Sequence, residues 1–115
     1  GYNMALFHAK DQETIIAQCT PQGSGALALI RLSGDTAFEV TDKICKLASR
    51  KKITEVPSHT VHYGSVIDEH GVIIDRVMII ALRSPRTFTG QDTIEITCHN
   101  NQFVIERIIE RAIAY

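Results

Sequence analysis

Two ionisable residues interrupt segments that otherwise have the pattern of β-strands, Arg31 within residues 26–33 and Glu95 within residues 92–98. A buried ion is costly unless it is paired, so each of the two needs a partner. They could pair with each other or lie at exposed strand ends, which would make them structural. Alternatively they line a pocket, where Glu95 accepts hydrogen bonds from the adjacent N–H groups of a planar heterocycle and Arg31 receives a carbonyl or an anion.

Other patterns associated with chemistry are less specific. Residues 23–28, GSGALA, match the dinucleotide-binding fingerprint, but the residues that follow alternate with a period of two instead of opening a helix, so they are interpreted as a turn between strands. The five histidines lack metal-ligand spacing, and no G-x-S-x-G elbow is present. The three cysteines are interpreted as buried thiols: Cys19, Cys45 and Cys98.

Length and composition favour one globular domain, since the chain has 115 residues, 44 % of them hydrophobic, and a formal charge of −1. The balanced charge gives no overall attraction to a nucleic-acid backbone. Three cysteines without paired spacing favour a reducing cytoplasm. No apolar run approaches about 20 residues and no signal-peptide pattern is present, so we expect a soluble protein without a membrane segment. Residues 1–3 precede Met4 and are treated as a candidate cloning remnant.

Hydrophobic periodicity predicts the elements that position Arg31 and Glu95. Strands are predicted at residues 14–20, 26–33 and 92–98, and residues 60–67 and 72–83 should form a hairpin around DEHG, with Gly71 at positive φ. In the last strand, Glu95 should share its face with Thr93 and Thr97. The segment 72–83 is apolar on both faces and is expected inside the sheet.

Two further segments have helical spacing. Residues 35–49 are predicted as a helix that opens with a capping box of Thr36 and Glu39. Residues 102–114 are predicted as an amphipathic helix that covers the sheet with its apolar stripe and exposes Glu106, Arg107, Glu110 and Arg111. The order of elements predicts an α+β domain with two helices and a mixed or antiparallel sheet of about five strands.

Several motifs together resemble one family. Residues 14–34, TIIAQCTPQGSGALALIRLSG, are similar to the opening of the MnmE (TrmE) family of tRNA-modification GTPases, which has T-I-x-A-x-A-T-P-x-G-x-G and then a strand ending in I-R-x-S-G. Later segments agree in order and spacing: HYG at 62–64, IDRVMII at 74–80, FTGQD at 88–92 and IEITCHNN at 94–101. The resemblance covers nearly the whole chain. Residues 13–115 are therefore assigned to the family's N-terminal domain, and residues 1–12 to an N-terminal extension.

The resemblance implies a fold similar to the tetrahydrofolate domain of the glycine-cleavage T-protein. It also implies a domain that forms a homodimer and binds 5-formyltetrahydrofolate or a related one-carbon tetrahydrofolate near the dimer interface. The family's folate contacts correspond to Arg31 and Glu95 in this sequence. By the same resemblance, these side chains would hold and orient the carbon donor without acting as nucleophile or base.

For the complete family protein, the resemblance implies a helical domain and a GTP-binding domain that uses GTP, Mg²⁺ and K⁺. Neither domain is in this sequence, so the chain is not expected to be catalytic alone. The complete protein would act with the FAD-dependent partner MnmG on carbon 5 of the wobble uridine of tRNA.

Two asparagines depart from the family pattern, because Asn100 and Asn101 stand where the family has Gly-Gly; Gln91 likewise replaces a glutamate. Asparagine accepts left-handed backbone angles, so the turn is expected to persist, but its side chain fills space that a ligand could use. An alternative is therefore a dimerisation module that has lost folate binding. A stand-alone one-carbon transferase would need a longer chain and an acidic catalytic residue that the sequence does not identify.

Overall fold

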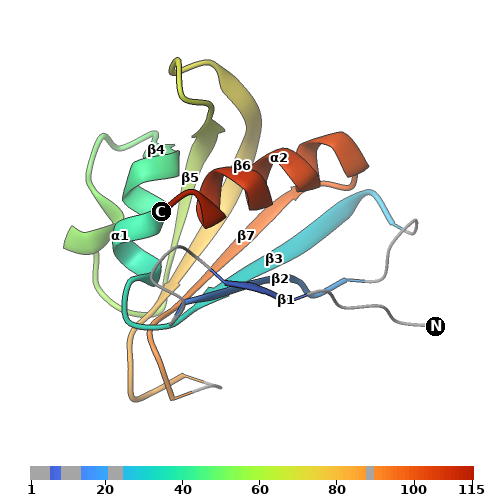
Figure 1. Cartoon of the computed structure of the whole chain (residues 1–115). Helices are drawn as coiled ribbons and strands as arrows, with labels where there is room; N and C mark the ends of the chain where they lie inside the picture. Colours follow the sequence, from blue (N-terminus) through green and yellow to red (C-terminus); the bar gives the residue numbers. More distant parts are fainter. Residues whose placement is uncertain (1–5, 9–13, 21–24, 88–89) are drawn as a thin grey trace.

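A computed structural model of the chain describes residues 6–8, 14–20, 25–87 and 90–115 (Figure 1). The described residues form one sheet of seven strands, namely β1 Leu6–His8, β2 Ile15–Gln18, β3 Leu27–Ser33, β4 Cys45–Leu47, β5 Thr60–Ile67, β6 Ile73–Leu82 and β7 Thr93–His99. Two α-helices and a short 3-10 helix complete the fold: α1 Ala37–Ile44, α2 Gln102–Ile113 and η1 Ile53–Glu55. The predicted α+β class is confirmed. The strands β1 and β4 account for the excess over the predicted five.

The strand order is β1-β2-β3-β7-β6-β5-β4, and every neighbouring pair is antiparallel. The prediction that the second hairpin arm lies inside the sheet is confirmed, since β6 runs between β7 and β5. The hairpin turn also follows the sequence, with Gly71 at φ 81°. β7 pairs with β3, although residues 34–92 separate them along the chain. This non-local pairing places Glu95 in the strand beside Arg31.

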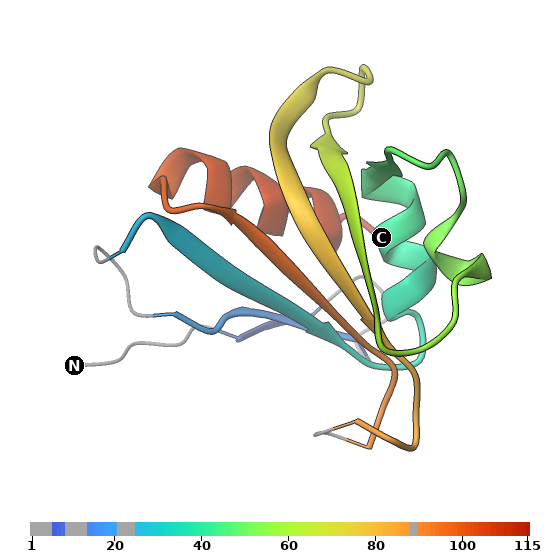
Figure 2. The same cartoon turned by 180° about the vertical axis from the view of Figure 1, so that it is seen from behind.

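Both α-helices pack on one face of the sheet, as Figure 1 shows, and the view from behind in Figure 2 shows the other face without a covering helix. The core lies between the sheet and the helices. Its largest fully buried side chains include Ile30, Leu32, Ile79, Ile94, Ile96, Ile105 and Ile108. Each contributes about 1.5–3 kcal/mol by removal from water. None of the helices in the described ranges is long and apolar enough to cross a membrane.

The first helix is shorter than predicted, because α1 ends at Ile44 rather than near residue 49. The next residues form β4, in which Cys45 and Leu47 are buried and Lys46 is exposed. Alternating burial is a strand pattern, but Cys45 also continues the helical spacing of Thr41 and Ile44, so the spacing in the sequence extended the helix too far. The predicted capping box is also wrong: Thr36 makes no side-chain cap to α1, and its Oγ1 lies 2.6 Å from the Oγ1 of Thr14.

The C-terminal helix places its apolar stripe on the sheet as predicted, but the expectation that Arg111 is on the exposed side is wrong. Its side chain is buried. The Nε donates a hydrogen bond to the carbonyl of Ile67 at 2.9 Å, and Nη2 donates to the carbonyl of Lys43 at 3.3 Å. Carbonyls in the last turn of a helix lack intrahelical partners. Arg111 therefore joins the end of β5 to the end of α1.

Gly64 in β5 permits the close approach of β4. A Cβ atom at this position would lie 2.5 Å from the carbonyl oxygen of Lys46 and 3.2 Å from the Cα of Leu47. Both contacts involve backbone, so β4 itself would have to move. The glycine is thus required by space at the sheet edge.

We expect Gly64→Ala to lower the free energy of unfolding by about 1–3 kcal/mol, the usual cost of overpacking. Gly71→Asn is the matched control, because a Cβ there meets nothing within 4 Å and asparagine tolerates its positive φ. Urea unfolding of the two variants measures the difference. Equal stability of Gly64→Ala and the wild type would contradict this expectation, because β4 would then shift without loss of stability.

Two of the three cysteines are buried as predicted, while Cys19 is only partly buried. Burial raises the pKa of Cys45 to about 12 and that of Cys98 to about 11, from an ordinary value of 9.0. At a pH between 9.0 and the raised pKa of each thiol, the native state keeps a proton on that thiol that the unfolded state has released. The contribution of these thiols to stability is therefore complete below about pH 9 and falls as the pH rises.

We expect the free energy of unfolding to fall between about pH 9 and pH 11, with up to about 1.4 kcal/mol per pH unit from each thiol. The double variant Cys45→Ala/Cys98→Ala should show a shallower fall, because it lacks both groups. Urea unfolding at several pH values compares the slopes. Parallel slopes for the two proteins would contradict the assignment to these thiols.

Candidate functional site

The structure brings Arg31 and Glu95 together on the uncovered face of the sheet. They are direct partners in the register of β3 and β7. The Arg31 Nη2 lies 3.2 Å from the Glu95 Oε2, and the side chains are 32 % and 17 % exposed. The mutual pairing that the sequence left open is therefore present. The two side chains also lie on the same face of the sheet, as a ligand site formed by both would require.

The pair uses only part of the hydrogen-bonding capacity of its members. Within the described residues, a single hydrogen bond joins the two side chains, from Arg31 Nη2 to Glu95 Oε2. A carboxylate accepts at two oxygens and a guanidinium has five N–H donors. The Glu95 Oε1 and further Arg31 donors can therefore meet a ligand without breaking the ion pair.

Cys19 is a third group beside this pair, which the sequence did not identify. Its backbone N–H donates to the carbonyl of Leu29 at 2.7 Å. Burial raises the pKa of the Cys19 thiol; the nearby Arg31 charge acts in the opposite direction, and Glu95 raises it further. Cys19 is therefore a neutral thiol at neutral pH rather than a nucleophilic thiolate.

Side chains on the uncovered face form three rows that cross the strands. The ionic row contains, from β3 to β5, Arg31, Glu95, Ile80 and Val61. The apolar row lies two residues further along each strand and contains Leu29, Thr97, Met78 and Tyr63. Two residues further again is the basic row, with His99 on β7, Arg76 on β6, Ser65 on β5 and Lys46 on β4. Successive rows are about 6.7 Å apart along the strands.

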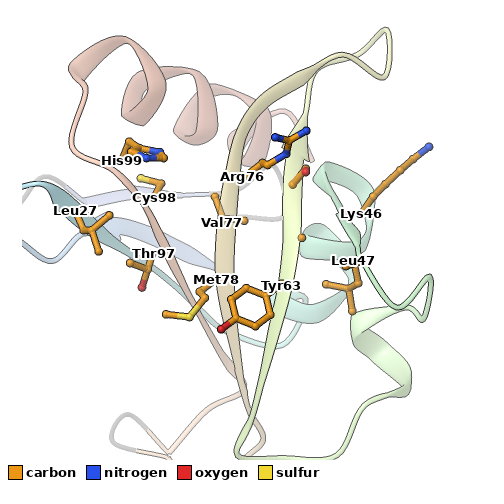
Figure 3. A pocket seen from close by; sticks show the side chains of 13 residues that line it. Leu27, Lys46, Leu47, Tyr63, Arg76, Val77, Met78, Thr97, Cys98 and His99 are labelled. Carbon is orange, nitrogen blue, oxygen red and sulfur yellow. The ribbon is translucent and has the colours of Figure 1, made fainter.

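A pocket of about 550 Å³ lies over the apolar and basic rows (Figure 3). Its walls include Leu27, Leu47, Tyr63, Arg76, Met78 and Thr97. This volume is within the usual range for small-molecule sites. Arg31 and Glu95 do not line the pocket themselves, but Glu95 is two residues from Thr97 on the same face of β7. The ionic row therefore forms the border of the pocket on one side.

On the opposite border, Asp75 holds His99. The Asp75 Oδ2 accepts a hydrogen bond from the backbone N–H of His99 at 2.8 Å, and its Oδ1 lies 2.8 Å from the His99 Nδ1. Asp75 is largely buried, whereas the imidazole is exposed at the pocket. The sequence contains a signal for this border of the pocket, because Asp75 and Arg76 are charges within an otherwise apolar strand. The same criterion identified Glu95.

The two asparagines after His99 stabilise the turn into α2, but not through left-handed angles as expected. Asn101 is the N-cap at φ −127°, and its side chain accepts a hydrogen bond from the Val104 N–H at 3.2 Å. Asn100 has no positive φ, and its Nδ2 donates to the carbonyl of Gly25 at 2.9 Å. Neither asparagine lines the pocket. Their side chains therefore serve the helix start and the beginning of β3.

The fold and the site together define a two-layer α+β domain with an Arg–Glu pair and a pocket on its uncovered sheet face. The family model described as "GTP-binding protein TrmE N-terminus" matches residues 14–115. The chain belongs to this family.

Curated relatives agree with the family model. The chain is 43 % identical over 103 residues to the tRNA modification GTPase MnmE of Geobacillus kaustophilus strain HTA426, which is 89 % of this chain and 22 % of the relative. It is 46 % identical over 101 residues to that of Staphylococcus haemolyticus strain JCSC1435, with coverages of 87 % and 22 %. The Staphylococcus aureus strain Newman protein is 43 % identical over 106 residues, with coverages of 91 % and 23 %. The chain thus spans less than a quarter of the length of these relatives.

Proposed function

We propose that this chain is the folate-binding and dimerisation domain of a tRNA-modification GTPase. In this proposal, Arg31 and Glu95 hold the pteridine of 5-formyltetrahydrofolate or of a related one-carbon tetrahydrofolate. The observation that carries the proposal is the in-register Arg31–Glu95 pair on an uncovered face beside a pocket of about 550 Å³. Family membership supplies the class of the whole protein.

The donor set fits the pteridine. A pteridine presents an amino group and a ring N–H side by side, and a carboxylate accepts from two such parallel donors. Glu95 has the acceptor capacity for this edge, and Arg31 can donate to the neighbouring ring carbonyl. The apolar walls of the pocket suit the benzoyl portion of a folate. The folate would carry the one-carbon unit, while the two side chains bind and orient it.

The dimer part of the proposal is supported by the same face. Large apolar side chains are exposed there, among them Leu27, Val61 and Tyr63. Contiguous exposed apolar surface commonly marks a protein-protein contact. A second copy on this face would shield the folate from water and would place the site close to the interface.

The activity of the whole protein is also part of the proposal. The relatives are named tRNA modification GTPases, and the chain matches about 22 % of the length of the first of them. GTP hydrolysis, with its Mg²⁺ and K⁺, would belong to the rest of such a protein. Together with MnmG in the cytoplasm, the protein would modify carbon 5 of the wobble uridine of tRNA. This chain would contribute the bound carbon donor.

Calorimetric titration with 5-formyltetrahydrofolate, combined with sedimentation equilibrium, tests the proposal. We expect binding of one folate per chain and a dimer. A dimer that gives no binding heat would favour the alternative, a dimerisation module that has lost folate binding. That alternative has one observation in its favour, because Arg31 and Glu95 already form an ion pair with each other. A monomer without binding would reject both.

A further inference from the structure

The basic row contains two cations that have no carboxylate partner within the described residues. Among the described residues, neither Arg76 nor Lys46 has an Asp or Glu oxygen within the 4.0 Å of an ion pair, in contrast to Arg31. The nearest acid along the strand, Asp75, is engaged by His99 through both of its oxygens. As far as the described residues go, Arg76 therefore presents a guanidinium without an ion-pair partner at the border of the pocket.

The position of Arg76 relative to Glu95 matches the length of a folate. Figure 3 shows its side chain above Met78 and Tyr63, directed from β6 toward β5. The basic row is four residues from the ionic row along the strands, which corresponds to about 13 Å. The apolar floor between them is formed by the row that contains Met78. A ligand that spans the three rows would therefore carry hydrogen-bond donors at one end, a flat apolar middle and an anion at the other end.

We propose that Arg76 binds the anionic glutamyl tail of the folate, so that the pocket selects folates by their tails. This inference rests on the proposed function, since it assumes that the pteridine lies at Arg31 and Glu95. The aminobenzoyl ring then lies over Met78 and Tyr63, and the first glutamate reaches Arg76. Guanidinium groups recognise carboxylates through paired, charge-assisted hydrogen bonds.

Lys46 extends the same row to the far edge of the pocket. It is the register partner of Ser65, which in turn is opposite Arg76. In Figure 3 its side chain points outward from the pocket, so it lies beyond the reach of the first glutamate. A second or third γ-linked glutamate would continue from Arg76 toward Lys46. The domain should therefore bind folates with several glutamates more tightly than the monoglutamate.

The experiment compares three probes by calorimetry: 5-formyltetrahydrofolate, its triglutamate, and 5-formyltetrahydropterin, which lacks the aminobenzoylglutamate. Arg76→Gln should weaken monoglutamate binding about tenfold, as loss of a charge-assisted hydrogen bond would, and leave pterin binding unchanged. Lys46→Gln should reduce only the advantage of the triglutamate. Arg107→Gln is the control, since it removes the same charge from α2 on the other face of the sheet.

The outcomes separate the inference from the proposed function. If no folate or pterin binds to the wild type, the proposed function fails and the inference fails with it. If folate binds but Arg76→Gln binds all three probes as the wild type does, the tail assignment is overturned and the pteridine site stands. Weaker binding of all three probes by Arg76→Gln would also overturn the tail assignment, because Arg76 would then act on the pteridine end.

Discussion

Glu95→Ala is expected to weaken the binding of 5-formyltetrahydrofolate by about 100-fold while it lowers the free energy of unfolding by less than about 1 kcal/mol. The loss of affinity corresponds to about 2.7 kcal/mol, which two charge-assisted hydrogen bonds to one pteridine edge can supply. The stability should change little, because Arg31 is about one third exposed and water can solvate it once its partner is removed.

Calorimetric titration and thermal unfolding measure the two effects on the same protein. Glu106→Ala provides the matched control, since it removes the same charge from an exposed position on α2 in the opposite layer. Equal folate affinity of the wild type and Glu95→Ala would exclude Glu95 from the site. A large loss of stability in Glu95→Ala would instead indicate that the pair with Arg31 is mainly structural.

Arg111→Ala should lower the free energy of unfolding by about 2–4 kcal/mol. The substitution removes the donors for the carbonyls of Ile67 and Lys43 and leaves a cavity between α2, β5 and α1. Both hydrogen bonds are partly buried, and a carbonyl left without a partner in such a place costs up to about 1–3 kcal/mol. Urea unfolding measures the loss.

Arg107→Ala is the comparison for Arg111→Ala, because it lies one turn earlier on the same helix. Its contacts are a 3.5 Å pair with Glu110 and a 4.0 Å pair with Glu69, both of them more exposed. Pairs of this kind contribute about 0–1 kcal/mol. Similar losses in the two variants would contradict the role assigned to the buried guanidinium.

The sequence predicted those elements in which buried residues recur with the period of a strand or of a helix throughout. β7 alternates between buried isoleucines and partly exposed polar residues, and α2 has an apolar stripe that fits one helical face. β1 escaped prediction because its three residues are all exposed and carry no pattern. The end of α1 was misplaced because Cys45 continues the helical spacing of Thr41 and Ile44, whereas the pairing of β4 with β5 makes it the start of a strand.

The burial of Arg111 was missed for a related reason. A helical projection places position 111 on the border of the apolar stripe of α2, and only the location of the last turn of α1 determines what lies there. Charged residues at such borders are usually exposed. The fold overrides that tendency by presenting two backbone carbonyls to the guanidinium.

For the candidate site, the cost of charge within a strand was enough to single out Arg31 and Glu95. The sequence could not show that β3 and β7 are neighbours in a register that pairs the two residues, since this depends on chain topology. The same criterion applies to Asp75 and Arg76, which are charges within the otherwise apolar strand β6. The basic border of the pocket is therefore known from the structure alone.

The position of the bound folate decides whether Arg31 and Glu95 form a ligand site. A crystal structure of this chain with 5-formyltetrahydrofolate would locate it. We expect the pteridine on the uncovered face of the sheet, with its N–H edge within hydrogen-bond distance of the Glu95 carboxylate. Electron density for the pteridine on the helix-covered side, or out of reach of both side chains, would contradict the assignment.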